Sequence, residues 1–295
     1  MIKKIIYIVL GSVVALITLF VISVLVVKAL MGSAETSFSG KTGVGLVEVK
    51  GMILDSEETV RQLRYFAKQD SVKVVVMRVD SPGGVVAPSQ EIYSEVKKFA
   101  AKKKIIVSMG SLAASGGYYI SAPANLIYAN PGTITASIGV LLNFSNIESL
   151  MDKIGIKSYT LKSGEYKDSG SASREMSKEE RAMFQSVIDN THEQFVRAVA
   201  EGRKLSLEHV REIADGRILS GEQAKTFKLV DKLGSLQDAI DEAGKLSGIS
   251  GTPEIITAPK KKIGLIDVLT GGVDGMFRGR IDAMNSGLKL MYKSE

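Results

Sequence analysis

The chain has 295 residues, of which 45% are hydrophobic and 24% charged, and a formal net charge of +6. It contains no cysteine, which excludes disulfides, thiolate metal sites and a cysteine nucleophile. It also lacks tryptophan and any nucleic-acid-binding motif, so the lysine runs at 102–104 and 260–262 indicate solvated surface charge and no nucleic-acid partner.

The N-terminal region is a long apolar block. Residues 5–27 contain no charge and are flanked by Lys3, Lys4 and Lys28. As a helix rising about 1.5 Å per residue, the block spans roughly 35 Å, enough for a hydrocarbon core of about 30 Å. A secretory signal has a shorter apolar stretch, typically about 7–15 residues. The sequence therefore predicts a retained, single-pass contact with the lipid bilayer of the cell membrane, and the paired lysines predict that the rest of the chain is extracytoplasmic.

The pattern divides the chain into four regions. We predict a membrane anchor at 1–32, a tether at 33–42, a folded domain at 43–248 and a C-terminal extension at 249–295. The tether is small and polar, as flexible linkers are. The extension is rich in glycine and weakly patterned, so it carries no structural prediction.

Strands and helices alternate through the folded domain. Alternating or β-branched runs predict strands, and apolar residues at helical spacing predict helices. The expected strands are an alternating run from Gly43, then 72–79, 105–108 and 126–129. The expected helices are 56–69, 89–103, one beginning near Ser115, 177–199, 206–214 and one within 216–234. Successive strand–turn–helix units predict an α/β fold of layered sheets and helices.

Three helix features are specific enough to test. Ser56 is placed to cap the first helix of the domain, and Ser177 with Glu180 forms a capping box. The long helix that follows has an apolar face containing Phe184, Val187, Ile188, Phe195 and Val199, which we expect to be buried.

Metal and cofactor chemistry find little support. His192 and His209 are the only histidines, they lie in different predicted helices, and His192 sits beside an apolar stripe as a structural histidine would. No phosphate-binding glycine loop is present, so we expect no metal and no cofactor. A Ser-His-Asp triad stays open, because triads are defined by geometry, but the candidates are few.

Ser115 is the clearest candidate nucleophile. It follows a strand, two alanines precede it and Gly116 and Gly117 follow it. Small neighbours let a substrate reach Oγ and let backbone N–H groups face a developing oxyanion. Gly116 could supply one donor, and Gly83 or Gly84, in a Pro-Gly-Gly turn, the other. The same residues could instead serve only tight helix–sheet packing, and composition leaves both interpretations open.

A serine without a histidine partner needs another base. Lysine can serve when burial or cationic neighbours lower its pKa. Lys167 lies in a loop with glycine and serine before the capped helix, but the chain has many lysines and residue chemistry alone does not choose among them.

Four stretches together resemble the signal peptide peptidase A family of serine–lysine peptidases, which is related in fold to the crotonase and Clp protease superfamily. They are DSPGG from Asp80, SMGSLAASGGYYISAPA from Ser108, ANPGTITASIGVL from Ala129 and KSGEYKD from Lys162. A fifth, GRILSGEQAKTFKLVDKLG from Gly216, resembles the closing segment of the family, except that Lys228 stands where many relatives have glycine.

The resemblance implies roles for these residues. Ser115 matches the nucleophile, Lys167 the general base, and Gly83, Gly84 and Gly116 the oxyanion hole. It implies a crotonase/Clp protease-like fold of repeated ββα units, a homo-oligomer in which the lysine could reach the serine of a neighbouring subunit, and hydrophobic peptide substrates such as cleaved signal peptides. Two alternatives remain at this point: a crotonase-like acyl-thioester enzyme, and a non-catalytic membrane scaffold.

Overall fold

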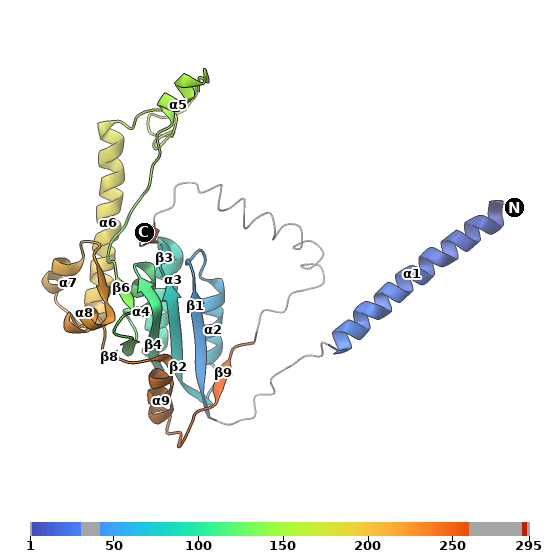
Figure 1. The fold of residues 1–295 in the computed structure, drawn as a ribbon, viewed down its shortest axis with the longest axis horizontal. Coiled ribbons are helices and arrows are strands. Elements are labelled where there is room, and N and C mark those ends of the chain that lie inside the picture. The colour runs from blue at the N-terminus through green and yellow to red at the C-terminus, as the bar shows by residue number, and fades with distance from the viewer. Residues whose placement is uncertain (1, 31–41, 260–290, 294–295) are drawn as a thin grey trace. The chain divides into compact units, whose positions relative to one another are not determined.

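The computed structural model describes residues 2–30, 42–259 and 291–293 (Figure 1). The chain forms two compact units, Met1–Lys41 and Thr42–Glu295. The first contains helix α1, Ile2–Leu30. Among the described residues, no helix combines the length and the apolar character that a membrane span needs, so the predicted transmembrane helix is not supported. The predicted tether lies outside the described residues except for Thr42, and the four predicted region boundaries stay predictions.

The second unit alternates strands and helices, as predicted. Its strands are β1 (Gly43–Lys50), β2 (Val72–Ser81), β3 (Gly83–Val85), β4 (Lys104–Ala114), β5 (Leu126–Ala129), β6 (Ile134–Ala136), β7 (Ile218–Ser220), β8 (Lys232–Leu233), β9 (Ile255–Thr257) and β10 (Met291–Lys293). Its helices are α2 (Glu57–Ala67), α3 (Val86–Ala100), α4 (Gly116–Ser121), α5 (Glu148–Lys153), α6 (Lys178–Arg203), α7 (Leu207–Ile213), α8 (Gly221–Thr226) and α9 (Leu236–Leu246).

Eight of these strands form one mixed sheet. Its main order is β7-β6-β4-β2-β1-β9, with β5 pairing both β4 and β8. The central pairs β1–β2 and β2–β4 are parallel, and β6–β7 is antiparallel. The mixed sheet with its helices confirms the α/β part of the predicted fold class.

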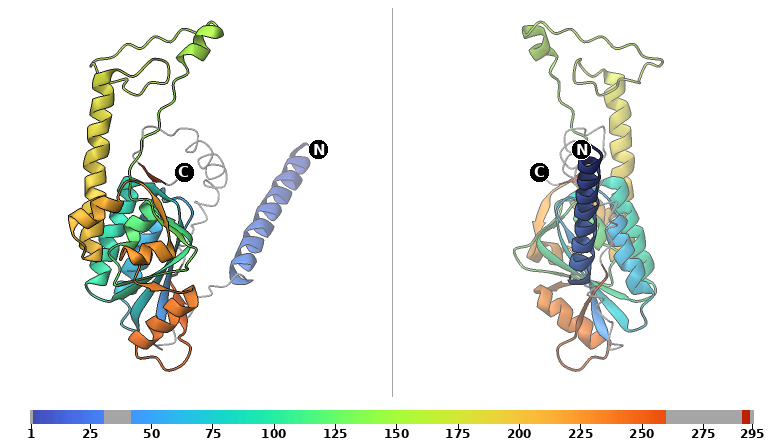
Figure 2. Two further views of the ribbon diagram at one scale, coloured as in Figure 1. Left: turned by 60° about the vertical axis from the view of Figure 1, so that its left-hand side comes forward. Right: turned by 90° about the vertical axis from the view of Figure 1, so that its right-hand side faces the viewer.

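Both faces of the central strands are covered. Val44, Val74 and Val76 point to the face on which Ala239 and Ile240 of α9 pack. A side chain at Gly45, one residue along β1, would instead meet Phe66 of α2. Successive strand residues point to opposite faces, so β-branched runs without polar alternation need helices on both sides. The two views in Figure 2 show the sheet between these helices.

Strand β4 is much longer than the predicted strand 105–108. Residues 106–108 pair with β5, and residues 112–114 then pair with β6, so the strand continues to the residue before Ser115. Gly110 permits this, because a Cβ there would lie within 3 Å of the Asp80 carboxyl group. The small residues in the second half of β4 do not form the β-branched pattern that predicts a strand, but the close packing of the strand requires small residues there.

The predicted cap at Ser56 is wrong. The Ser56 side chain accepts no hydrogen bond from the first turn of α2 and instead donates to the carboxylate of Glu91 on α3. Asp55 takes the capping role in part, since its Oδ1 accepts from the backbone N–H of Glu57 at 3.2 Å. The hydrogen bond to Glu91 on another helix thus replaces the local capping bond that was expected of Ser56.

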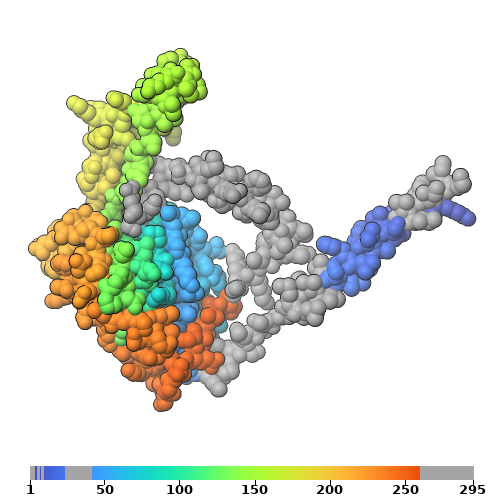
Figure 3. Space-filling model, in the orientation of Figure 1, coloured from blue at the N-terminus to red at the C-terminus, as the bar shows by residue number. Residues whose placement is uncertain are grey.

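The capping box of α6 is confirmed: Ser177 Oγ accepts from the N–H of Glu180, whose carboxylate accepts from the N–H of Ser177. The predicted apolar face is only partly buried. Phe195 and Val199 are buried, whereas Val187 is 47% exposed. The N-terminal part of α6 extends past the sheet and, with residues 143–177, forms a projection that we call the arm (Figures 1 and 3).

Candidate active site

Ser115 lies at the junction between β4 and α4. Its backbone adopts φ 54° and ψ −116°, which is rare for a residue with a side chain. The residue is fully buried, and its Oγ has no hydrogen-bond partner among the described residues. A strained serine at a sharp strand-to-helix turn is the geometry that presents a hydroxyl for nucleophilic attack.

Backbone strain gathers around this serine. Ala136 and Ser137 also have left-handed φ values, 62° and 50°, and the Ser115 N–H donates to the Ala136 carbonyl at 2.7 Å. Within the described ranges only two other non-glycine residues share this region, Lys204 and Lys228. Strained residues persist where the surroundings fix them and tend to gather at functional sites.

The glycines expected in an oxyanion hole lie together. A Cβ on Gly116 would lie 3.1 Å from both the Cα of Gly83 and the backbone N of Gly84. A Cβ on Gly84 would lie 2.1 Å from the carbonyl oxygen of Ile53, so both positions exclude a side chain. The N–H of Gly83 donates to Ser81 Oγ at 3.1 Å, which leaves Gly84 as the better donor for a substrate. The N–H of Gly116, in the first turn of α4, has no acceptor within its own helix.

Aromatic residues fix α4 against the rest of the domain. The Tyr119 ring lies 4.9 Å from the Tyr93 ring of α3 and 4.9 Å from the Phe195 ring of α6. The buried Tyr118 hydroxyl donates to the Leu229 carbonyl at 3.0 Å, and burial raises the pKa of this hydroxyl above its ordinary range. The start of α4, and with it Ser115, is therefore held rigidly.

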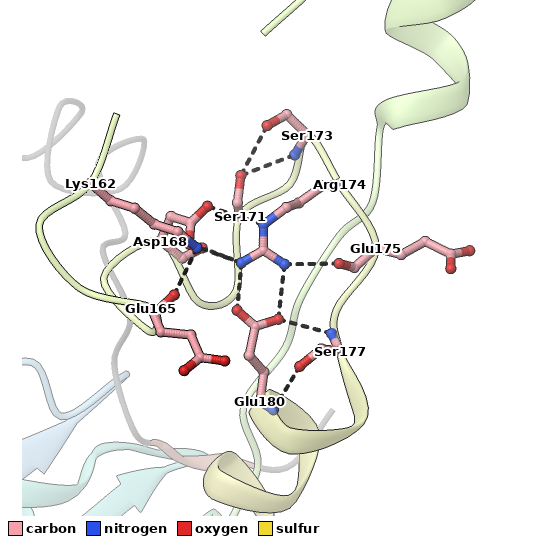
Figure 4. A network of polar contacts seen from close by, with 9 residues as sticks. All are labelled: Lys162, Glu165, Asp168, Ser171, Ser173, Arg174, Glu175, Ser177 and Glu180. Atoms are coloured by element: carbon pink, nitrogen blue, oxygen red, sulfur yellow. Dashed lines mark hydrogen bonds and ion pairs between the residues drawn. The ribbon is translucent and has the colours of Figure 1, made fainter. Parts of the chain in front are cut away.

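Lys167 belongs to the arm, not to this buried site. Its side chain is exposed, and no described residue makes a hydrogen bond or ion pair with its amine. The neighbouring Asp168 forms ion pairs with Lys162 (2.6 Å) and Arg174 (3.0 Å), and Arg174 also pairs with Glu180 of α6 at 2.5 Å (Figure 4).

One chain does not bring Lys167 and Ser115 together. Phe195 marks where α6 contacts α4, whereas Glu180, which holds the lysine loop, lies near the other end of α6. With a rise of about 1.5 Å per residue, those two positions are roughly 20 Å apart along the helix. Figures 1 and 2 show the arm at that distal end, away from the sheet.

The histidines do not replace the lysine in this chain. His209 Nε2 contacts the carbonyl oxygen of Phe227 at 3.2 Å. His192 Nε2 is buried, and like Ser115 Oγ it has no partner among the described side chains. A triad through either histidine is thus not formed.

A cavity of about 570 Å³ begins beside the strained segment. Ser137 lines it together with Val140, Leu141, Ile188 and Ile218. Parallel pairing of Ala114 with Ala136 brings Ser137, the residue after β6, close to Ser115, the residue after β4. The walls also include the polar or charged side chains of Gln185, Asp189, His192 and Asp215, so the cavity offers both apolar and polar contacts to a side chain of a bound peptide.

A buried, strained serine that lies at the start of a helix, beside the backbone of a Gly-Gly turn, has the geometry of a serine hydrolase site. Comparison with known proteins then gives the family. The sequence model of peptidase family S49 matches residues 97–250, and that of Clp protease matches residues 49–132. The chain belongs to peptidase family S49 and is a serine peptidase. This sets aside both alternatives, the thioester enzyme and the non-catalytic scaffold.

Two individual relatives and one solved structure are similar to this chain. A candidate protease of Synechocystis sp. is 40% identical over 79% of this chain and 85% of its own length. A candidate signal peptide peptidase of Enterococcus faecium is 36% identical over 72% of this chain and 66% of its own. A mutant form of ClpP1 from Listeria monocytogenes matches in structure with a TM-score of 0.45 and 18% identity, over 66% of this chain and 93% of that one.

Sequence reasoning missed several residues around the serine. Ser81 binds the Gly83 N–H, Ser89 Oγ would lie 2.9 Å from a Cβ on Gly116, and Ala136 accepts from the Ser115 N–H. The stretch containing Ala136 and Ser137 is part of the family resemblance, but its residue types do not predict a left-handed backbone at these two positions. Arg174 was missed as well, because its partners are set by the folded loop.

Proposed function

We propose that the protein hydrolyses peptide bonds with Ser115 as nucleophile and Lys167 as general base. The observation that carries the proposal is the unpartnered, buried Oγ of Ser115 beside the clustered glycines 83, 84 and 116. A serine peptidase needs a nucleophilic hydroxyl, and Ser115 Oγ is the candidate for it. Lys167 is the lysine of the KSGEYKD stretch whose amine has no partner among the described residues, and that stretch resembles the family.

The chemistry follows from the two groups. Neutral Lys167 Nζ accepts the proton of Ser115 Oγ, and Oγ attacks the carbonyl carbon of the peptide bond. Amides of Gly84 (or Gly83) and Gly116 stabilise the oxyanion. The ammonium then donates its proton to the leaving amine, and an acyl-enzyme remains on Ser115. Water, deprotonated by the same lysine, releases the acid and restores the serine.

We propose that the lysine comes from a second copy of this chain. The arm holds Lys167 far from Ser115 of its own chain, as the length of α6 indicates. The arm also exposes apolar side chains that a monomer would leave in water, which is typical of an interaction surface. They are Ile147, Leu150, Ile154, Ile156, Tyr159 and Leu161. A homo-oligomer that buries them would bring the arm of one copy to the serine of another.

The proposed substrate is an extended, largely apolar peptide such as a cleaved signal peptide. Strand β3, which carries Gly83 and Gly84, accepts a strand in antiparallel pairing, since Met291–Lys293 pairs with Gly83–Val85. A peptide bound by strand addition would use the same hydrogen-bonding edge and would have to displace β10. The cavity beside Ser137 would receive one of its side chains.

Membrane attachment belongs to the proposal too. It rests on the uncharged run at 5–27 between flanking lysines. Extraction of cell membranes with alkaline carbonate, and digestion of intact cells by an added protease, would test anchoring and sidedness. Release of the full-length protein by carbonate would refute the anchor.

Labelling with a fluorophosphonate probe tests the chemistry directly. We expect the purified wild type to be labelled, and both Ser115→Ala and Lys167→Ala to lose labelling by at least about a thousandfold, because such catalytic units fail together. Labelling that survives Lys167→Ala would place the base elsewhere. Labelling that survives Ser115→Ala would refute the nucleophile.

A further inference from the structure

The loop that carries Lys167 is fastened by one arginine. The Arg174 guanidinium donates to six acceptors, namely the four carboxylate oxygens of Asp168 and Glu180, the Glu175 carbonyl and, at 3.4 Å, the Asp168 carbonyl (Figure 4). The other five distances lie between 2.5 and 3.0 Å. Arginine is the one side chain with this fixed fork of donors, so no other residue could make the same set of bonds.

The two carboxylates lie on different segments. Asp168 is the neighbour of Lys167 in the loop, whereas Glu180 is in the first turn of α6 and also closes the capping box with Ser177. Their side chains are 13% and 5% exposed, which makes this pairing firmer than a surface ion pair. Arg174 therefore joins the lysine loop to the helix that runs to the core.

The charges in this cluster cancel. Lys162 and Arg174 carry two positive charges, and Asp168 and Glu180 carry two negative ones. The other titratable groups of the two segments that meet here are Glu165, Tyr166, Glu175, Lys178, Glu179 and Arg181, all of which are exposed. Without Arg174, the carboxylates would leave one net negative charge on the loop that carries Lys167, and a nearby negative charge favours the ammonium form of a lysine. That form cannot accept a proton from serine.

We propose that Arg174 is a positioning residue for the reaction: it clamps Asp168 to Glu180, fixes the loop that presents Lys167, and cancels the carboxylate charge on that loop. The inference rests on the proposed role of Lys167. It assigns to Arg174 a function in both the placement of the base and the pH at which the base acts.

Three variants separate the two effects. Arg174→Met removes the charge and the clamp together. Arg174→Lys keeps the charge but loses the paired hydrogen bonds to both carboxylates. Lys162→Met removes the positive charge that is paired with Asp168 and leaves the hydrogen bonds between Arg174 and Glu180 in place. Arg61→Met is the matched control, because Arg61 makes a similar pair with Glu58 on α2, outside the arm.

The measurement is the rate constant of fluorophosphonate labelling of the full-length oligomer, followed from neutral to strongly alkaline pH. For Arg174→Met we expect at least about a tenfold slower reaction at neutral pH, and an acid limb moved upward by about 0.5–1 pH unit, a shift reduced by solvent screening. Arg174→Lys should restore the position of the acid limb but only part of the rate. Lys162→Met should move the acid limb with a smaller loss of rate, and Arg61→Met should match the wild type.

Two results would overturn the inference. The first is a folded, oligomeric Arg174→Met protein with the wild-type rate and pH profile. The second is a loss of rate that is equal at every pH and not relieved by Arg174→Lys, as general loosening of the arm would give. If Arg174→Met does not fold, Arg174→Lys and Lys162→Met still test clamp and charge separately. Wild-type labelling of Lys167→Ala, in contrast, would refute the proposed base itself, whatever the Arg174 variants do.

Discussion

The surroundings of Ser115 and those of Lys167 are held by different forces. Ser115 is fully buried, its backbone is strained, and Gly84 and Gly116 beside it have no room for a side chain. Lys167 is exposed, and its loop is held by a few ion pairs to the start of a helix. The first region is complete within one chain and should tolerate little change. The second should respond to charge, pH and assembly.

The largest effect should come from mixing two inactive proteins. If the lysine of one copy serves the serine of another, oligomers that contain both Ser115→Ala and Lys167→Ala chains will regain labelling. Each variant alone should be reduced by about a thousandfold or more. Labelling should appear only on the Lys167→Ala chains, which a size tag would distinguish. No recovery in oligomers shown to be mixed would contradict the shared site and would require the arm of each chain to fold back.

Gly116→Ala should damage the buried region next. The added Cβ would lie 2.9–3.1 Å from Ser89 Oγ, Gly83 and Gly84, so the amides that face the oxyanion must shift. We expect the labelling rate to fall by about a hundredfold, the usual cost of losing an oxyanion donor. Gly132→Ala is the control, since a Cβ at Gly132 would meet nothing within 4 Å. Equal rates for the two variants would show that the glycine cluster is not the oxyanion hole.

As pH falls, the arm should lose its folded structure at a higher pH than the core of the domain does. Arg174, and then the Ser177 N–H, lower the pKa of Glu180 from 4.5 to about 2, and Arg174 with Lys162 holds the pKa of Asp168 below its usual range. A carboxylate whose pKa is lower in the folded state stabilises that state above its unfolded pKa, and this stabilisation is lost as pH falls to the folded pKa. Protease sensitivity of residues 143–177 should therefore stay constant down to about pH 4.5 and rise between there and about pH 2. Glu180→Gln should be sensitive already at neutral pH, and an arm whose cleavage does not depend on pH would contradict this account.

The smallest effect concerns Lys228, which lies outside both regions. Lys228 has φ 61° at the C-terminal end of α8, where the N–H groups of Lys228 and Leu229 bond back to Lys225 and Ala224. Helices commonly end on glycine in this conformation. Lys228→Gly should raise the free energy of unfolding by about 0.5–1 kcal/mol, measured by thermal or urea denaturation, without changing the labelling rate. A destabilised variant would show that the lysine side chain makes up for its strained backbone.

Much of the fold was predictable because its causes are local. Val72–Ser81 is a β-branched run that becomes the central strand β2, and the Ser177–Glu180 box begins α6 as expected. The predictions that were wrong assumed that a residue would contact its own helix or the core, whereas the folded chain places it elsewhere. Ser56 bonds to Glu91 in place of its own helix, and Val187 is exposed because α6 extends beyond the core it was expected to cover.

The same division holds for the candidate site. Ser115 and the glycines at 83, 84 and 116 could be selected from the sequence, since small residues at a strand end allow close backbone approach whatever surrounds them. The left-handed backbone at Ala136 and Ser137, the clamp made by Arg174, and the separation of Lys167 from Ser115 were decided by tertiary structure alone. Each of these features depends on contacts between different segments of the chain, and the residue pattern within one segment does not predict where another segment will lie.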